Sequence, residues 1–480
     1  MSIARGIRLS LPADWLGIGE QNDFVTLGLP CLAAVATTGD IVLIQTPAEA
    51  IVAFLSFANR SEGAVLALEK LTQRQWQRVQ LWLDDCGLAF YFLQQLKNTN
   101  STAITPPFVL SRLERNFALN QARVDAMSLR FNEINERFYD AGVRYEVVKG
   151  FSLVPEFCPY ASLRYQGDFD YLIEDVSLPD AKRVLTDLGY NSRLSQSAKE
   201  SIFVSAGAKP SRGAEQYSPE AAHAVELHTD IWDNEMQGLQ PIPNLFSVDQ
   251  CKIRHWNGVS FPAQADEDAF LLQVLHACHH LFTQWIRVSN LLEIAYFLYR
   301  RWSDTDLWHR IEQRVGGSAI VREFVVIVVE LATRLFAAPS PRLVQDWRTH
   351  LRRESQVWIE HYGRDWALCE LPAYGLSFFP RSRLVLFLQQ QYRSASTSSE
   401  AKPQDSSASP RLSRVIFTLK RQPWLLLSRE WRQSNLLVRR SVYYVLARAR
   451  YICEIPRWRW LTRTSASPAS GYFLPSKDNS

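Results

Sequence analysis

The residues best suited to chemistry are two aspartates, Asp168 and Asp170, in a stretch where polar and apolar residues alternate. On a β-strand, residues two apart point to the same face, so both carboxylates converge while Phe169, Tyr171 and Ile173 pack behind them. Like charges held this close require a shared proton or a bound cation. Mg²⁺ suits such an oxygen-only site, because it takes a few carboxylates, keeps waters and bridges substrate phosphates.

A third carboxylate, Glu226, lies in a second strand pattern, two residues before His228 and on the same face. If this strand pairs near Asp168 and Asp170, Glu226 could complete the metal site or deprotonate an attacking hydroxyl. His228 is interpreted as a packed or hydrogen-bonded strand residue rather than as a base.

Groups suited to phosphate flank these acids. Lys149-Gly150 follows a strand pattern, and a glycine turn that opens a short helix presents free backbone N–H groups to an anion. Ser152 could add a hydroxyl donor. Lys149 and Arg164 supply positive charge for the electrostatic stabilisation of phosphoryl transfer. Two other interpretations are equally good. Arg164 could form a structural ion pair with Asp168 or Asp170, and Lys149 could be an exposed lysine at the end of its strand.

A histidine cluster raises a zinc alternative, since His276 and His280 share a helix face and Cys278 and His279 lie between them. No glutamate follows His276, as the metalloprotease pattern requires. Helical core and surface histidines near a cleft are therefore the favoured interpretation.

Taken together, these motifs resemble the uncharacterised nucleotidyltransferase family of the polymerase-β-like superfamily, over roughly 110–298. The resemblance is carried by Lys149-Gly150, the Arg-x-x-x-Asp-x-Asp strand at 164–170, a helix ending at 188–190, Val-Glu-Leu-His at 225–228, and the helical patterns at 276–280 and 291–295. It implies a small mixed sheet, two Mg²⁺ ions, and transfer of a nucleoside monophosphate from a nucleoside triphosphate (NTP) to a hydroxyl-bearing acceptor.

Residue by residue, the resemblance implies that Asp168 and Asp170 are the metal-binding pair and Glu226 the third carboxylate. Gly150 matches the phosphate-loop glycine. The chain departs from the wider superfamily at Phe151, which separates Gly150 from Ser152 where Gly-Gly or Gly-Ser is usual.

The elements expected to position these residues alternate between β and α. An amphipathic helix over 111–139, stopped by Ala141-Gly142, leads into a strand at 145–148; a helix capped by Ser177 runs to 188. Further strands are expected at 168–173, 201–205 and 224–232, and helices at 270–282, 288–302, 320–336 and 343–361. The predicted fold class is α+β, a small mixed sheet flanked by helices and followed by a mainly helical domain.

The predicted organisation has six parts. A mostly helical region of unknown role, 1–105, contains a helical pattern at 76–96 and a short β-like start at 41–44. The others are a nucleotidyltransferase-like core (106–262), a helical domain (263–392), a serine-rich linker (393–410), a basic aromatic-rich helical tail (411–464) and a disordered terminus (465–480).

Composition limits the class of protein. A chain of 480 residues that is 47% hydrophobic can bury large cores, which excludes collagen-like and wholly disordered classes. No apolar run reaches the roughly 18 residues of a membrane span. The first thirty residues lack a secretion pattern, and the seven cysteines are scattered without a Cys-x-x-Cys pair, so a cytoplasmic location is expected.

Charge is distributed unevenly. Residues 411–464 hold 13 Lys and Arg against two acids, a local +11 within a net charge of +4, so the rest of the chain carries −7. Eight aromatic residues accompany the arginines. The tail could pack on the acidic body, dock peripherally at an anionic inner membrane surface, or bind nucleic acid, the least favoured partner.

The expected function is a metal-dependent nucleotidyltransferase acting on a small molecule or protein; the alternative is a catalytically inactive nucleotide-binding or scaffold protein.

Overall fold

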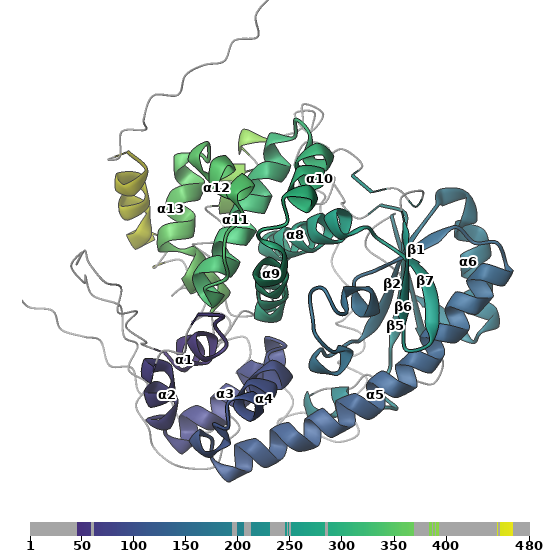
Figure 1. Ribbon diagram of the computed structural model, residues 1–480, viewed down its shortest axis with the longest axis horizontal. Coiled ribbons are helices and arrows are strands. Elements are labelled where there is room, and N and C mark those ends of the chain that lie inside the picture. The colour runs from purple at the N-terminus through teal and green to yellow at the C-terminus, as the bar shows by residue number, and fades with distance from the viewer. Residues whose placement is uncertain are drawn as a thin grey trace, which may run out of the picture. The chain divides into compact units, whose positions relative to one another are not determined.

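The computed structural model describes residues 46–58, 62–193, 199–205, 213–230, 245–246, 248, 251–283, 287–368, 384–385, 387–388, 390–392, 449 and 452–463. The fold of these residues is α+β, as predicted: one mixed sheet of seven strands is flanked by helices (Figure 1). Among the described helices, none combines the length and the hydropathy that crossing a membrane requires.

The sheet has the strand order β3-β4-β5-β2-β1-β7-β6. Its strands are β1 (Tyr145–Val148), β2 (Asp168–Ile173), β3 (Tyr190–Arg193), β4 (Glu200–Ser205), β5 (Ala224–His228), β6 (Lys252–Trp256) and β7 (Val259–Ala263). The pairs β2/β5 and β1/β7 are parallel and the others antiparallel. The predicted strands at 145–148, 168–173 and 201–205 are confirmed, and β5 is the described part of the pattern at 224–232.

Three strands were not predicted. The hairpin of β6 and β7 turns at Asn257-Gly258, where both residues have positive φ, 48° and 82°. Asn-Gly between two apolar runs is a strong hairpin signal, so the sequence carried the information. Only the first residue of β3, Tyr190, is buried, which leaves that strand without an apolar pattern.

One face of the sheet packs on α5 (Pro107–Asp140) and α6 (Leu178–Asp187) in a shared apolar core. Phe131 of α5 lies 5.7 Å from Phe169 and 5.0 Å from Phe261, measured between ring centroids. Phe169, Tyr171 and Ile173 are all buried in this core, as predicted. Because side chains alternate along β2, Asp168 and Asp170 lie on the opposite face.

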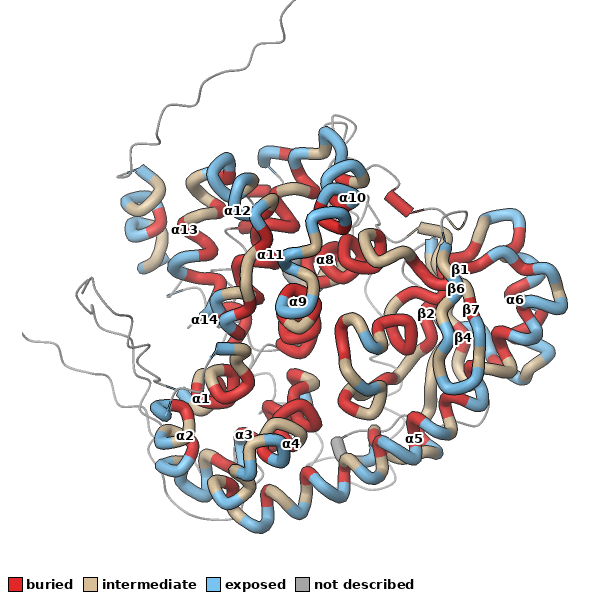
Figure 2. The backbone as a smooth tube through the Cα atoms, viewed as in Figure 1, coloured by how far each residue is buried: buried red, intermediate tan, exposed pale blue. Residues whose placement is uncertain are grey.

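The remaining helices form a second apolar core, which also takes in Val148 of β1 and Leu172 of β2. Buried residues dominate α8, α9 and α11 (Figure 2). The helices are α1 (Pro47–Phe54), α2 (Glu62–Glu69), α3 (Gln73–Asp85), α4 (Ala89–Asn98), α8 (Asp266–Thr283), α9 (Val288–Arg301), α10 (Thr305–Val315), α11 (Ala319–Phe336), α12 (Arg342–Thr349), α13 (Arg353–His361) and α14 (Gly363–Ala367).

Three predicted details are wrong. The helix expected over 343–361 is two helices: α12 ends at Thr349, and the extended Arg352 (φ −65°, ψ 150°) precedes α13. The pattern at 76–96 is broken between α3 and α4 at Gly87, whose φ is +72°. Ser177 does not cap α6 with its side chain; its hydroxyl accepts a hydrogen bond from the Arg144 backbone N–H (3.1 Å).

Several predictions lie outside the described residues: the β-like start at 41–44, the linker at 393–410, the terminus at 465–480 and most of the basic tail. The described tail residues 452–463 are helical. Trp458 is buried against the ring of Tyr362 (5.6 Å), and the Tyr362 hydroxyl donates to Glu454 Oε2 (3.1 Å). For these residues the contacts match the alternative in which the tail packs on the body.

Candidate functional site

Strands β2 and β5 bring two of the predicted carboxylates directly opposite each other. In their parallel register Asp170 pairs with Glu226, while Asp168 pairs with Ala224 and lies two residues earlier on the same strand as Asp170. Partners in a ladder share a face of the sheet, so Asp168, Asp170 and Glu226 point to one side. The convergence expected from the two strand patterns is therefore present.

His228 joins this acidic group more closely than the sequence suggested. Its Nε2 lies 3.2 Å from Asp170 Oδ1 and 3.6 Å from Glu226 Oε2. Burial disfavours the charged ring, but hydrogen bonds to Asp170 and Glu226 outweigh it and raise the pKa of His228 to about 9. The imidazolium is thus a hydrogen-bond donor at neutral pH, in agreement with its interpretation as a bonded strand residue.

Lys149 contacts the same Asp170 oxygen as His228. Its Nζ donates to Asp170 Oδ1 (2.8 Å), and the Lys149 and Asp170 side chains are only 18% and 4% exposed. Burial alone would raise the pKa of Asp170, yet the Lys149 charge and the His228 hydrogen bond hold it well below its usual range. Asp170 is therefore ionised, with two cations on one oxygen.

The pKa of Asp168 is shifted in the opposite direction from that of Asp170. Desolvation and the charges of Asp170 and Glu226 raise the pKa of Asp168 to about 7. Within the described part of the chain, no side chain forms an ion pair or hydrogen bond with its carboxylate. An incoming cation would meet this carboxylate open and would relieve the repulsion among the three acids.

The turn after β1 is a four-residue 3-10 helix, Gly150–Leu153, rather than the start of a longer helix. Gly150 has φ +49°, and a Cβ there would lie 2.6 Å from Gln166 Nε2, so only glycine fits without a shift. The Ser152 hydroxyl donates to the Lys149 carbonyl oxygen (2.7 Å). That proton is committed to the turn, although the hydroxyl oxygen can still accept a hydrogen bond.

Lys149 itself has φ 57° and ψ −157°, a backbone region that is almost exclusive to glycine. Non-glycine residues persist there only when their surroundings hold them, and such strain clusters at functional sites. Here the ion pair with Asp170 is the contact that holds the Lys149 side chain.

Arg164 pairs with neither aspartate. Its Nε lies 2.7 Å from Glu293 Oε1 of α9, and its Nη1 donates weakly to the Gly150 carbonyl (3.4 Å). The Tyr91 hydroxyl of α4 donates to the same Glu293 oxygen (3.0 Å). Burial opposes the guanidinium charge, but Glu293 more than compensates and raises the pKa of Arg164. Arg164 thus links the glycine turn to two helices.

Sequence reasoning missed two charged residues of this region. Glu293 lies within the 291–295 pattern that entered the resemblance, but nothing in its spacing identified Arg164 as its partner. Arg287 stacks on the Tyr165 ring (5.6 Å from guanidinium carbon to ring centroid), and its charge acts on Asp168. It precedes α9 as one isolated arginine, so no local pattern marked it.

The histidines that raised the zinc alternative lie close together on α8, with 6.0 Å between the ring centroids of His279 and His280. His276 Nε2 lies 3.0 Å from His280 Nε2, while Cys278 is buried elsewhere in the helical core. Burial, followed by the charge of Lys149, holds the pKa of His276 well below its usual range, so the ring is neutral. In the described residues, the single group of three or more metal-binding side chains is Asp170, Glu226 and His228.

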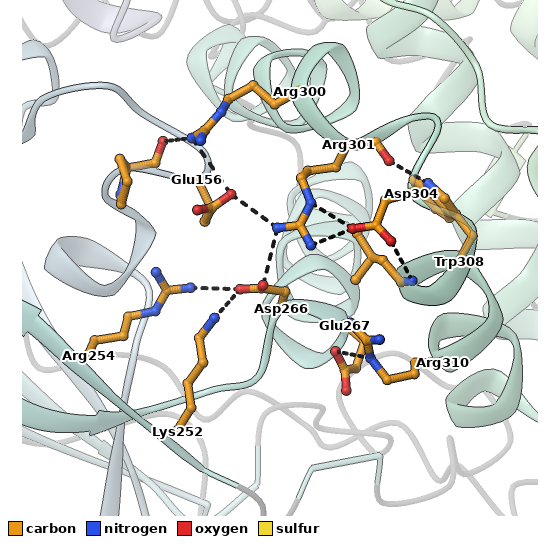
Figure 3. Close-up of polar contacts among 12 residues, drawn as sticks. Glu156, Lys252, Arg254, Asp266, Glu267, Arg300, Arg301, Asp304, Trp308 and Arg310 are labelled. Atoms are coloured by element: carbon orange, nitrogen blue, oxygen red, sulfur yellow. Dashed lines mark hydrogen bonds and ion pairs between the residues drawn. The ribbon is translucent and has the colours of Figure 1, made fainter.

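A charged network connects the edge strand β6 to the helices (Figure 3). Asp266, at the start of α8, pairs with Lys252 and with Arg254 of β6 (3.1 Å), and with Arg301 of α9 (3.2 Å). Arg301 also contacts Glu156, in the loop that follows the glycine turn (3.3 Å). The network therefore joins β6, α8, α9 and that loop.

The donor set fits a divalent cation. Ligand oxygens of Asp170 and Glu226 lie within 4.8 Å of each other, and Asp168 adds an open carboxylate to the same face. A ring nitrogen of His228 lies within the same distance, but as an imidazolium it is a neighbouring positive charge rather than a ligand. Carboxylate oxygens are the donors that Mg²⁺ and Mn²⁺ prefer. The Lys149 and His228 contacts with Asp170 provide the positive charge that would otherwise have to come from such a cation.

Comparison with known proteins adds one finding. No curated protein matches the chain. The family described as uncharacterised nucleotidyltransferase matches residues 72–337, more than half of the 480 residues, including β1, β2, β5 and α9. By this match the chain belongs to the uncharacterised nucleotidyltransferase family.

Proposed function

We propose that this protein is a metal-dependent nucleotidyltransferase of polymerase-β-like architecture, which transfers a nucleoside monophosphate from an NTP to a hydroxyl on a small molecule or protein. The observation that carries the proposal is the β2/β5 register, which sets Glu226 opposite Asp170 and beside Asp168. Family membership supports the reaction class.

Asp168, Asp170 and Glu226 would hold Mg²⁺, two ions in all. When bound, Mg²⁺ would neutralise the triphosphate and the departing pyrophosphate. The raised pKa of Asp168, close to 7, means that its proton leaves easily when a cation approaches.

The chain's own residues have distinct roles in the proposed reaction. Gly150, where a side chain would strike Gln166, keeps the turn whose backbone N–H groups would face a phosphate. Lys149, once released from Asp170, can turn its ammonium to the triphosphate. The new bond joins the acceptor oxygen to the α-phosphorus, and the bond to the bridging oxygen breaks to release pyrophosphate. The hydroxyl proton passes to Glu226, whose side chain is 23% exposed.

A second candidate is a protein that binds nucleotide without transferring it, because Lys149 and His228 both neutralise Asp170. Two measurements separate the candidates: binding of a non-hydrolysable NTP with and without Mg²⁺, and pyrophosphate release from labelled NTPs given a pool of hydroxyl acceptors. The isosteric Asp170→Asn is the test variant. Asp180→Asn, which alters an exposed ion pair on α6, is the matched control.

We expect wild type and Asp180→Asn to bind the analogue in a Mg²⁺-dependent way and to release pyrophosphate, and Asp170→Asn to do neither. Binding without release would favour the silent nucleotide-binding protein. Absence of nucleotide binding in the wild type, with or without Mg²⁺, would contradict both candidates.

A further inference from the structure

Arg123, in the middle of α5, is a buried arginine that pairs with no carboxylate among the residues that the structure describes. Its side chain is 1% exposed. Its guanidinium donates to four main-chain carbonyls: Nε to Gln166 (3.1 Å), Nη1 to Ser218 (3.1 Å) and Ala221 (2.8 Å), and Nη2 to Ala222 (3.1 Å). Burial lowers the pKa of Arg123, as expected for a desolvated cation. A group this costly to bury needs a function beyond generic packing.

The four carbonyls belong to two segments that lead into the strands of the site. Gln166 lies two residues before the start of β2, and Ser218, Ala221 and Ala222 come shortly before the start of β5. Because β2 and β5 are parallel, both strands begin at the same edge of the sheet. One guanidinium therefore fastens both entry points to one helix.

The first contacts between the two strands lie beside this clamp. Between the strands, the Ala224 backbone N–H donates to the Gly167 carbonyl (2.9 Å). Within the segment that enters β2, the Gln166 side chain donates to the Asp168 carbonyl (3.0 Å). From that point the register runs to Asp170 opposite Glu226. A slip of one residue would turn every side chain of β5 to the other face, so Glu226 would leave the carboxylate group.

Only arginine can make this set of contacts. Its planar fork carries five N–H donors in fixed directions, whereas lysine carries three on one nitrogen. The charge of Arg123 also acts on Asp168, so the clamp lies close to the acids. The Tyr165 ring packs on the guanidinium at 5.5 Å and helps to hold it.

We propose that Arg123 is a positioning residue: its guanidinium holds the entries of β2 and β5 together and so sets the register that places Glu226 beside Asp170. The link to metal binding rests on the function proposed above. The link to register does not, since it concerns the pairing of two strands.

The test compares Arg123→Lys, which keeps the charge and loses the fork, with Arg130→Lys on the same helix. Arg130 is 59% exposed and pairs with Glu133 at the surface, so its substitution is the matched control. Two readouts are taken on full-length protein: hydrogen–deuterium exchange of the Ala224 amide, and Mn²⁺ affinity by electron paramagnetic resonance. Exchange reports local opening, which a uniform loss of stability would not confine to one strand pair.

In Arg123→Lys we expect the Ala224 amide to exchange at least about tenfold faster while α9 amides stay unchanged. We expect Mn²⁺ affinity to fall about 10- to 100-fold, as when residues that orient metal ligands are replaced. Arg130→Lys should match wild type in both. Unchanged exchange at Ala224, or equal acceleration in α9, would overturn the positioning role.

If Arg123→Lys does not fold, the same two measurements are made on Arg123→Gln at low temperature. Failure of both to fold would count against the proposal, because the residue would then serve the fold as a whole. If the wild type binds no Mn²⁺, the proposed function fails alone, and the Ala224 amide still decides the inference about register.

Discussion

Replacing Lys149 with methionine is expected to make stability depend on a divalent cation. The Lys149 ammonium lies 2.8 Å from an Asp170 carboxylate that is 4% exposed. In Lys149→Met, His228 is the one cation among the described residues that still directly contacts the three converging acids. Methionine keeps the length of the side chain, so the change is chiefly the loss of one buried charge.

The magnitude follows from the burial of the pair. Removing one partner of a buried ion pair costs roughly 3–5 kcal/mol, and the lower figure applies here because Lys149 is partly exposed and His228 remains. In a cooperative folding unit of about 150–250 residues, 1 kcal/mol shifts Tm by about 2–4 °C. Without metal, Lys149→Met should therefore unfold about 6–12 °C below wild type.

A bound cation should restore most of this loss. At a concentration 100 times its Kd, a ligand stabilises the folded state by about 2.7 kcal/mol. In the wild type Lys149 competes for Asp170, so the rise in Tm with metal should be smaller. The assay is thermal unfolding in chelator and in millimolar Mn²⁺, with Lys70→Met, at an exposed lysine, as the control.

Two results would refute the reasoning. The Tm of Lys149→Met in chelator could lie within about 2 °C of wild type, which would mean that the pair is worth no more than a surface contact. Alternatively the Tm could fall and remain low in Mn²⁺, which would show that the three acids do not bind a cation.

Three further predictions concern the surroundings of the site. Gly150→Ala should cost about 1–2 kcal/mol in urea unfolding and weaken NTP binding, because alanine is strained at φ +49° and meets the Gln166 amide; an unchanged midpoint would contradict this. Glu293→Gln should lower the unfolding free energy by about 3–5 kcal/mol by leaving buried Arg164 unpaired, and a double variant with Arg164→Met should recover part of the loss if the pair is coupled. Burial and, to a smaller extent, nearby arginine charges lower the pKa of His223 from 6.5 to about 4. Between pH 6.5 and about 4, the unfolded chain therefore binds more protons at His223 than the folded chain does. Stability should therefore fall by about 1–2 kcal/mol as pH drops from 7 to 5, and His223→Gln should lose that dependence in urea titrations at each pH.

The sequence predicted the elements that carry strong local patterns. Alternation over 168–173 identified β2 and placed Phe169 and Tyr171 in the core, and glycine at 142 marked the end of α5. The same alternation put Asp168 and Asp170 on one face, with Glu226 on a second strand. These features depend on neighbours in the chain, for which periodicity and turn chemistry are sufficient evidence.

Partners distant in the chain could not be read in this way. Arg164 and Glu293 are separated by 129 residues, and the Arg123 contacts reach Ala222 across 99. Sequence reasoning expected Arg164 near the aspartates and gave Arg123 no role. The break at Gly87 also involves a residue distant in the chain, since a Cβ there would lie 2.6 Å from Ser289 Oγ of α9.

By itself, then, the sequence determined which residues could do chemistry and on which face of a strand each would lie. Only the tertiary structure decided that Lys149 and His228 neutralise Asp170 and that Arg164 pairs with Glu293. It also decided that buried Arg123 binds the segments that lead into β2 and β5. The physical reason is that strand periodicity is a property of local backbone geometry. Ion pairing and register instead depend on which distant groups are desolvated together, and only the folded chain brings those groups into contact.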